Sequence, residues 1–206
     1  MKQLAMMGGS FNPPHLGHIH AAKAAAESLN LDKVLFIPSK IPPHKGLPKG
    51  TPEPEVRFEL TKLAVAEEER FEVSDIELMR EGYSYTAVTA RILYDLYPGY
   101  KLWLILGTDM LETFAMWYKP HEIVKYMSLA VVGRKNNDDE ILMSCAENLR
   151  KTLGAEVEII DTEAFEVSST QIRELLCKGK TDEAGRFLPA KVKEYILRER
   201  LYIIHD

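Results

Sequence analysis

Short apolar runs recur along the chain, and segments with helical spacing of apolar residues lie between them. The runs at 4–7, 34–38, 101–106, 129–133 and 157–160 predict strands, and 101–106 is apolar almost throughout. Such runs are typical of strands that a parallel sheet buries on both faces. Residues 71–76 alternate between apolar and polar and also predict a strand. Residues 21–27, 55–68 and 85–97 predict helices, as does most of the chain from 169 onward. This alternation predicts an α/β fold: a Rossmann-like three-layer parallel sheet with a small helical C-terminal extension.

Length and composition narrow the class of protein. The 206 residues, 46% of them hydrophobic, fit one domain, with an α/β core at 1–167 and a mostly helical part at 168–206. A net charge of −5 argues against a general nucleic-acid binder. Cys145 and Cys177 lack the spacing of a metal site or a disulfide framework, and no apolar run approaches 18 residues. We therefore expect a cytoplasmic protein with no membrane contact.

The segment 7–18, with the sequence MGGSFNPPHLGH, carries the strongest chemical signal. It joins the first predicted strand to the first predicted helix, and its glycines let backbone N–H groups approach an anion near a helix end. His15 and His18 beside this turn favour chemistry on a phosphate. Two alternatives stay open: a purely structural turn, or a metal cluster that includes His20. The segment is not a P-loop, because the terminal Gly-Lys-Ser/Thr is missing.

A second predicted helix N-terminus lies at 167–173, with the sequence VSSTQIR. Ser168 and Gln171 fit a capping box, which is the simpler interpretation. Three hydroxyl groups, free N–H groups and Arg173 one turn later also suit a polyphosphate. If both helix ends face one site, they would hold a triphosphate from two sides.

Four further clusters follow predicted strands or lie in the long loop at 39–54. An acidic side chain at the strand end in Gly107-Thr108-Asp109 can accept hydrogen bonds from ribose, although it can also simply cap the next helix. Trp117 in 117–120 offers a stacking surface for a flat ring, or belongs to the core. Ser84-Tyr85-Thr86 is a helix cap or a ligand contact. The loop residues Lys40, His44 and Lys45 are either solvated or directed to a second anionic group.

These motifs together resemble the nicotinate mononucleotide adenylyltransferase family of the HxGH-motif nucleotidyltransferases, over nearly the whole chain. The resemblance rests on residues 8–18, 37–38 with 42–45, 84–86, 107–109, 117–119 and 168–173 in this order. Many members carry Asp at the position of Asn12. Two related families fit this sequence less well. Phosphopantetheine adenylyltransferases usually have threonine in place of the first histidine, and aminoacyl-tRNA synthetases need a longer chain. A nucleotide sensor without turnover is the alternative from another class.

The resemblance implies a reaction and a role for each motif. The reaction transfers the adenylyl group of ATP to nicotinate mononucleotide, with His15, His18 and Arg173 as catalytic residues and Mg²⁺ carried mainly by the ATP phosphates rather than by protein side chains. The residues implied for ATP are Gly8, Gly9, Ser10, Phe11, His15, His18, Gly107, Asp109, Arg134, Ser168, Ser169, Thr170 and Arg173. Those implied for the mononucleotide are Lys40, His44, Lys45, Tyr85, Thr86, Trp117 and Tyr118. The sequence leaves open the preference for the acid over the amide mononucleotide and the oligomeric state, a homo-oligomer included.

Overall fold

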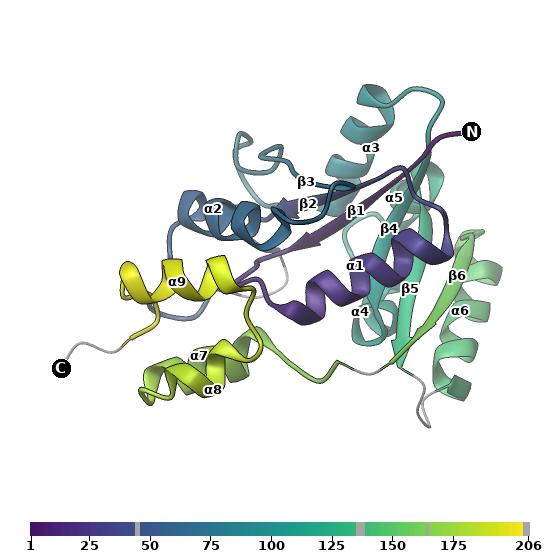
Figure 1. Cartoon of the computed structure of the whole chain (residues 1–206). Helices are drawn as coiled ribbons and strands as arrows, with labels where there is room; N and C mark the ends of the chain where they lie inside the picture. The colour runs from purple at the N-terminus through teal and green to yellow at the C-terminus, as the bar shows by residue number, and fades with distance from the viewer. Residues whose placement is uncertain (44–45, 135–138, 164, 204–206) are drawn as a thin grey trace.

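A parallel sheet of six strands forms the centre of the molecule (Figure 1). The computed structural model describes residues 1–43, 46–134, 139–163 and 165–203. The strands are β1 (Gln3–Gly9), β2 (Lys33–Pro38), β3 (Phe71–Val73), β4 (Lys101–Gly107), β5 (Ser128–Arg134) and β6 (Val157–Thr162). They lie in the order β3-β2-β1-β4-β5-β6, and every neighbouring pair is parallel. The predicted Rossmann-like parallel sheet is confirmed.

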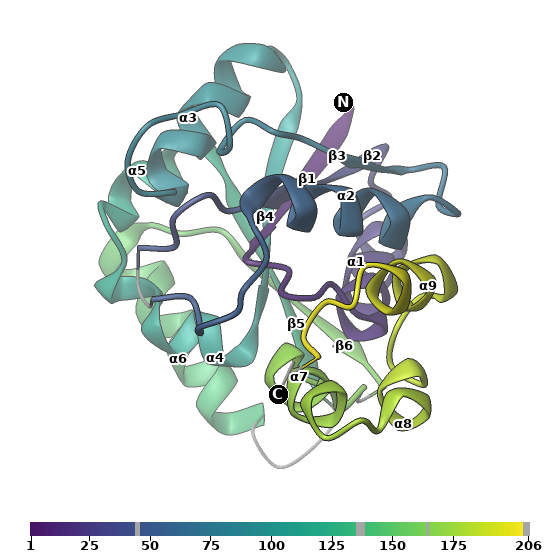
Figure 2. The same ribbon diagram turned by 90° about the vertical axis from the view of Figure 1, so that its left-hand side faces the viewer.

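Helices cover both faces of this sheet, which gives the three predicted layers (Figure 2). One face carries α1 (Leu16–Ser28), α2 (Pro54–Val65), α7 (Ser169–Cys177), α8 (Thr181–Gly185) and α9 (Ala190–Arg198). The other carries α3 (Thr86–Leu96), α4 (Thr108–Thr113), the short 3₁₀ helix η1 (Phe114–Met116), α5 (Pro120–Tyr126) and α6 (Asp139–Leu153).

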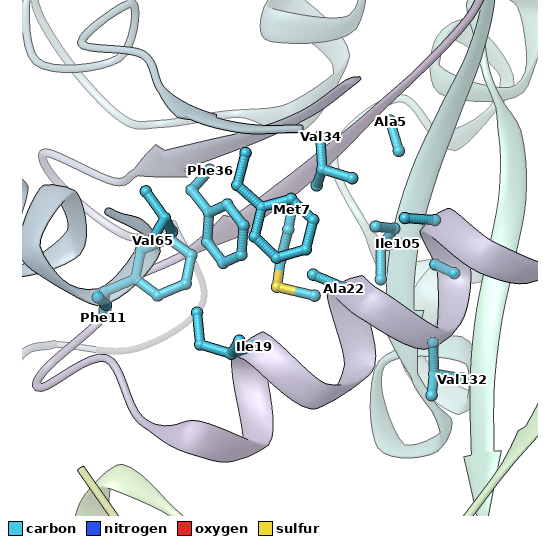
Figure 3. Close-up of a cluster of buried hydrophobic side chains, with 14 of the residues drawn as sticks. Ala5, Met7, Phe11, Ile19, Ala22, Val34, Phe36, Val65, Ile105 and Val132 are labelled. Carbon is cyan, nitrogen blue, oxygen red and sulfur yellow. The ribbon is translucent and has the colours of Figure 1, made fainter. Parts of the chain in front are cut away.

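Alternation along the strands divides the core into two clusters. In β1, Ala5 and Met7 face the α1 side, where they pack with Val34 and Phe36 of β2 (Figure 3). Leu4 of the same strand faces the α3 side. Successive side chains of a strand point to opposite faces, so a continuous apolar run can fill both clusters at once.

The central strands separate where the chain reverses its direction of winding. The β1–β4 ladder ends at the pair Met6 and Leu104. Beyond it, β1 pairs only with β2, up to Gly9, whereas β4 pairs only with β5, up to Gly107. In open parallel sheets such a switch point, at the carboxyl ends of the strands, is where ligands bind. The topology therefore brings the two glycine-containing motifs to one place.

Candidate active site

The two glycines of the first motif belong to the strand and not to the turn. Gly8 and Gly9 pair with Ile37 and Pro38 of β2, so β1 is longer than the predicted run at 4–7. The interpretation of the glycine pair as a tight strand-to-helix turn is wrong for this reason. A Cβ at Gly8 would meet no atom closer than 3.6 Å. Gly8 therefore leaves the backbone open to a ligand, whereas a Cβ at Gly9 would touch the Phe11 ring at 3.4 Å.

The turn itself is made by residues 10–14, and Phe11 anchors it. Phe11 has a φ of 44°, in the left-handed region that costs energy for a residue with a Cβ. Its ring is buried, with the Phe36 ring 5.7 Å away (Figure 3). The His18 ring lies 5.1 Å from it. Burial of a large aromatic side chain holds the strained backbone in place. Only the backbone of Phe11 is left to meet a ligand.

His15 and His18 stack against each other at the start of α1, which begins at Leu16 rather than at the predicted residue 21. Their ring centroids are 3.7 Å apart, and the His15 backbone N–H donates to His18 Nδ1 at 3.1 Å. Since Nδ1 accepts, the neutral His18 ring carries its proton on Nε2 and can donate from there. Burial lowers the pKa of His15 to about 4. Burial, and then the nearby His15, lower the pKa of His18 well below its ordinary value. Both rings are thus neutral donors near pH 7.

Hydrogen bonds join the turn to the N-terminus of α7. Arg173 Nη1 donates to the Asn12 carbonyl at 2.6 Å, and Ser169 Oγ donates to the Pro13 carbonyl at 2.8 Å. Ser168 caps α7 by accepting from the Gln171 N–H at 3.1 Å. The structure therefore brings together the two helix N-termini that the sequence predicts separately as phosphate sites. It also gives Ser168 the capping role that was the simpler interpretation.

Gly17 allows this close approach, a role that we did not infer from the sequence. A Cβ there would lie 2.9 Å from Val167 Cγ1 and 3.0 Å from His15 Nδ1. Ordinary carbon contacts are about 3.5–4.0 Å, so only glycine fits between the His15 ring and the segment that leads into α7.

Buried polar atoms without a partner gather around the same turn. In the described part of the chain they are Asn12 Oδ1, His15 Nδ1, Ser39 Oγ and Tyr202 Oη. The Tyr202 hydroxyl lies close enough to Arg173 and Arg57 that both lower its pKa, although burial raises it more. Buried polar groups normally have partners, and a cluster without them marks a place where water or a ligand completes the hydrogen bonding.

Arg57 of α2 contacts the turn through hydrogen bonds to backbone carbonyls. No motif in the sequence predicted a role for this residue. Its side chain is fully buried, and Nη1 donates to the Ser10 carbonyl at 2.6 Å. Nη2 donates to the Ser39 carbonyl at 2.8 Å. Asn12 makes a parallel link, because its Nδ2 donates to Thr51 Oγ1 at 2.8 Å. An Asp at position 12 could not donate this hydrogen bond.

The residues predicted to contact the mononucleotide ring lie where α3 approaches the segment before α5. The Tyr85 and Tyr118 rings stack with centroids 4.1 Å apart, which brings Thr86, the first residue of α3, near the 117–119 segment. Trp117 is partly buried: its ring lies 5.3 Å from Phe114, and it packs against the core cluster of this face. The core interpretation thus describes the packed side of Trp117, and its use as a stacking surface stays a prediction.

Lys40 is held in a hydrogen-bond network instead of standing alone. Its Nζ donates to the Arg80 carbonyl at 3.2 Å, and its backbone N–H donates to Ser84 Oγ at 3.0 Å. Behind Ser84 lies the buried Glu77, which accepts from Thr89 Oγ1 at 2.7 Å. Burial raises the pKa of Glu77, and hydrogen bonds from Thr89 and Ser84 oppose this. The network fixes the 84–86 motif next to the 39–43 segment.

Of the remaining predicted site residues, the structure describes two and leaves three undescribed in whole or in part. Gly107 ends β4 with open space where a Cβ would be, and Asp109 is exposed in the first turn of α4, at the switch point. His44 and Lys45 lie outside the described residues, as does the side chain of Arg134 at the end of β5.

The described residues contain no group of three His, Cys, Asp or Glu side chains that could hold a metal ion. His20, the third member of the metal cluster considered from the sequence, instead contacts Thr162 Oγ1 at 2.7 Å and the Glu163 carbonyl at 3.1 Å. None of the helices in the described ranges has the length and apolar character needed to cross a membrane.

Comparison with known proteins decides the family. A cytidylyltransferase-like family model matches residues 6–175. A protein of Lachnoclostridium phytofermentans named "probable nicotinate-nucleotide adenylyltransferase" is 34% identical, with 98% of this chain and 100% of that protein aligned. The chain belongs to the nicotinate-nucleotide adenylyltransferase family. A family member of the same name from Listeria innocua is also 34% identical, with 97% of each chain aligned. The resemblance drawn from the six motifs is confirmed.

Solved structures agree on the fold of this adenylyltransferase family. The nicotinic acid mononucleotide adenylyltransferase of Plasmodium falciparum, described as complexed with APC, aligns with a TM-score of 0.78 at 15% identity. A second structure of that enzyme, complexed with NaAD, gives a TM-score of 0.77 at 17% identity. Each alignment covers 98% of both chains. At these identities the likeness shows a shared fold.

Proposed function

We propose that this protein transfers the adenylyl group of ATP to nicotinate mononucleotide, which yields nicotinate adenine dinucleotide and pyrophosphate in NAD biosynthesis. The observation that carries the proposal is the joined pair of helix ends. The α1 and α7 N-termini meet through Arg173 and Ser169 at the switch point, beside the neutral His15 and His18. Two helix N-termini and an arginine provide partial and full positive charge for a triphosphate. The names of the relatives supply the second substrate.

The reaction needs positioning more than acid–base chemistry. The 5′-phosphate of the mononucleotide is an anionic nucleophile at pH 7, and it attacks the α-phosphorus of ATP. A bond forms from that phosphate oxygen to the α-phosphorus, and the bond from the α-phosphorus to the bridging oxygen breaks, with pyrophosphate as the leaving group. No general base is required. Orientation of the two anions and stabilisation of the developing charge therefore provide the rate enhancement.

The donors around the turn fit this task. His18 Nε2–H and the His15 ring serve as neutral donors to the phosphates, and their fixed stacking lowers the reorganisation that the transition state requires. Arg173 donates from Nη1 and Nη2 within the protein. In the described chain no carboxylate forms an ion pair with it, so its positive charge is available to a triphosphate. Thr170, whose hydroxyl accepts from Arg173, contributes at the same helix end. Arg134 joins this set as a proposal from the family resemblance.

The family resemblance, together with the positions of these residues in the fold, supports two other ligand regions. Gly107 and Asp109 at the end of β4 hold the adenosine, Asp109 through the ribose hydroxyl groups. On the other side, Trp117 stacks on the pyridine ring, and Thr86 with the Tyr118 backbone lies near its carboxylate. His44 and Lys45 are directed to the mononucleotide phosphate. Lys40 aids them by fixing the loop, since its amine is already bonded to the Arg80 carbonyl.

The substrate is the Mg²⁺ complex of ATP, in which the metal is carried mainly by the phosphate oxygens. Mg²⁺ usually keeps waters and phosphate ligands in such sites and neutralises charge as pyrophosphate leaves. The two cysteines without disulfide spacing favour the reducing cytoplasm as the compartment.

The direct test is pyrophosphate release with ATP and Mg²⁺ plus one of three acceptors: nicotinate mononucleotide, nicotinamide mononucleotide or phosphopantetheine. We expect the highest kcat/KM with nicotinate mononucleotide. Preference for phosphopantetheine, or binding of ATP without pyrophosphate release under any condition, contradicts the proposal. The amide mononucleotide arm measures the selectivity for the acid.

A further inference from the structure

Arg57 connects the two segments that the proposed function assigns to different substrates. Its guanidinium donates to the Ser10 carbonyl in the phosphate turn and to the Ser39 carbonyl at the end of β2. Longer hydrogen bonds reach the Lys40 carbonyl at 3.4 Å and the Pro52 carbonyl at 3.3 Å, at the two ends of the loop. One buried side chain thus contacts both the ATP turn and the loop of residues 39–53.

The charge of Arg57 is unusual for a group used only to fill the core. The side chain is fully buried, and among the described residues no carboxylate forms an ion pair with it. Burial lowers the pKa of Arg57, and the nearby Tyr202, Glu55 and Glu53 oppose this only in part. A cation buried without a direct ion pair is expensive, and apolar packing would stabilise α2 at lower cost. Its carbonyl partners offset this cost only in part. The positive charge therefore has a use at the turn that an apolar side chain would not provide.

The geometry of the peptide group shows what that use is. In a planar trans peptide the carbonyl of one residue and the N–H of the next point in opposite directions. Arg57 holds the Ser10 carbonyl toward α2, so the Phe11 N–H points away from it, and no acceptor among the described residues takes this N–H. The next two peptide groups of the turn precede Asn12 and Pro13, and the second has no N–H to offer. Phe11 is thus the turn residue whose donor Arg57 can aim.

We propose that Arg57 is a positioning residue for adenylyl transfer, which directs the Phe11 N–H to the triphosphate and ties this donor to the loop that serves the mononucleotide. This inference rests on the proposed function. It does not make Arg57 a catalytic residue, because the side chain acts through the backbone of Ser10 and Phe11. The Arg57 hydrogen bond adds to the buried Phe11 ring in holding the strained φ of 44° at Phe11, because it fixes the orientation of the peptide group on the N-terminal side of that residue.

The test compares two buried positions in the same helix. Arg57→Lys keeps the charge, but an ammonium cannot bridge Ser10 and Ser39 in the planar manner of a guanidinium. The matched control is Thr61→Val, because Thr61 is fully buried one turn later and its hydroxyl contacts only the Arg57 carbonyl, at 2.7 Å. We measure kcat and both KM values by pyrophosphate release, with the melting temperature of each variant.

We expect Arg57→Lys to lower kcat by about 10- to 100-fold, below the ~10²–10³ typical for full loss of one transition-state donor, and to raise the KM for nicotinate mononucleotide several-fold. Thr61→Val should lower the melting temperature by about 2–4 °C and leave kcat within twofold of the parent. If Arg57→Lys does not fold, Arg57→Gln, which can still donate to one carbonyl, is measured instead.

The outcomes separate this inference from the proposed function. An unmodified protein that releases no pyrophosphate overturns the proposed function and, with it, the role of Arg57. An active unmodified protein whose Arg57 variants lose stability but keep kcat and both KM values overturns the role of Arg57 alone. A kcat loss of equal size in Thr61→Val also overturns it, because the effect would then come from the stability of α2.

Discussion

Gly17→Ala tests the contact between the two helix N-termini most directly, because the added methyl group would lie between them. The new Cβ would lie 2.9 Å from Val167 Cγ1 on one side and 3.1 Å from His15 Cε1 on the other. Comfortable contact needs about 3.5–4.0 Å, so the two neighbours must separate by roughly 0.5 Å or more. His15 already stacks on His18 at 3.7 Å and has little room to retreat. The segment that leads into α7 must move instead.

The energetic and catalytic consequences have different sizes. Overpacking of this kind costs about 1–3 kcal/mol, and replacement of a helical glycine by alanine returns up to ~1 kcal/mol, so the net loss of stability is modest. Displacement of donors by a fraction of an ångström is more costly, since a shift of ~1 Å can reduce a rate by about 10². We therefore expect kcat to fall at least tenfold while the melting temperature changes by only a few degrees, on the order of 2–4 °C per kcal/mol.

The assay measures pyrophosphate release at saturating substrates, together with thermal unfolding. Gly185→Ala is the matched control, because the three atoms nearest to its Cβ, from 2.7 Å, would all belong to the flexible Lys193 side chain, at the end of α8. That side chain can swing away, so the control should keep its activity. A Gly17→Ala protein with kcat within twofold of the parent would refute the argument that the spacing between His15 and Val167 sets the geometry of the site.

Three further outcomes are expected. His18→Ala should lower kcat by roughly 10²–10³, as expected for one lost transition-state donor, and near-normal turnover would exclude His18 from that role. Burial lowers the pKa of His15 to about 4, so between pH 6.5 and pH 4 the unfolded chain binds a proton at this residue and the folded protein does not. Proton binding to the unfolded chain lowers the free energy of unfolding by on the order of 3 kcal/mol at pH 4. Urea unfolding should show this acid-dependent loss in the unmodified protein and a smaller one in His15→Gln; equal losses would contradict the pKa. Trp117→Ala should raise the KM for nicotinate mononucleotide about tenfold with little change in that for ATP, and an equal change in both would point to collapse of its packing on Phe114.

The linear sequence contains most of the fold and much of the site. Continuous apolar runs such as 101–106 predict a parallel sheet because only burial on both faces tolerates them, and the structure places them there. The predicted ends of the strands are less accurate than the strands themselves. β3 ends at Val73 rather than at residue 76, because it is an edge strand that pairs only with β2. The glycine–histidine and serine–arginine motifs are local helix-start signals, and such signals depend on neighbours within one turn. That is why they can be read without the fold.

Tertiary structure decided how those signals combine. Residues 156 and 161 positions apart in the chain meet when Ser169 and Arg173 bond to the carbonyls of Pro13 and Asn12, and no local pattern predicts that contact. Arg57 gave no signal at all, since an arginine in an amphipathic helix reads as a solvated residue until its side chain is found buried under the turn. Sequence by itself determined the elements and the chemistry that each can offer. Only the packing of α2 and α7 around one turn decided which of these groups act together, because backbone carbonyls become partners only when the fold brings a donor to them.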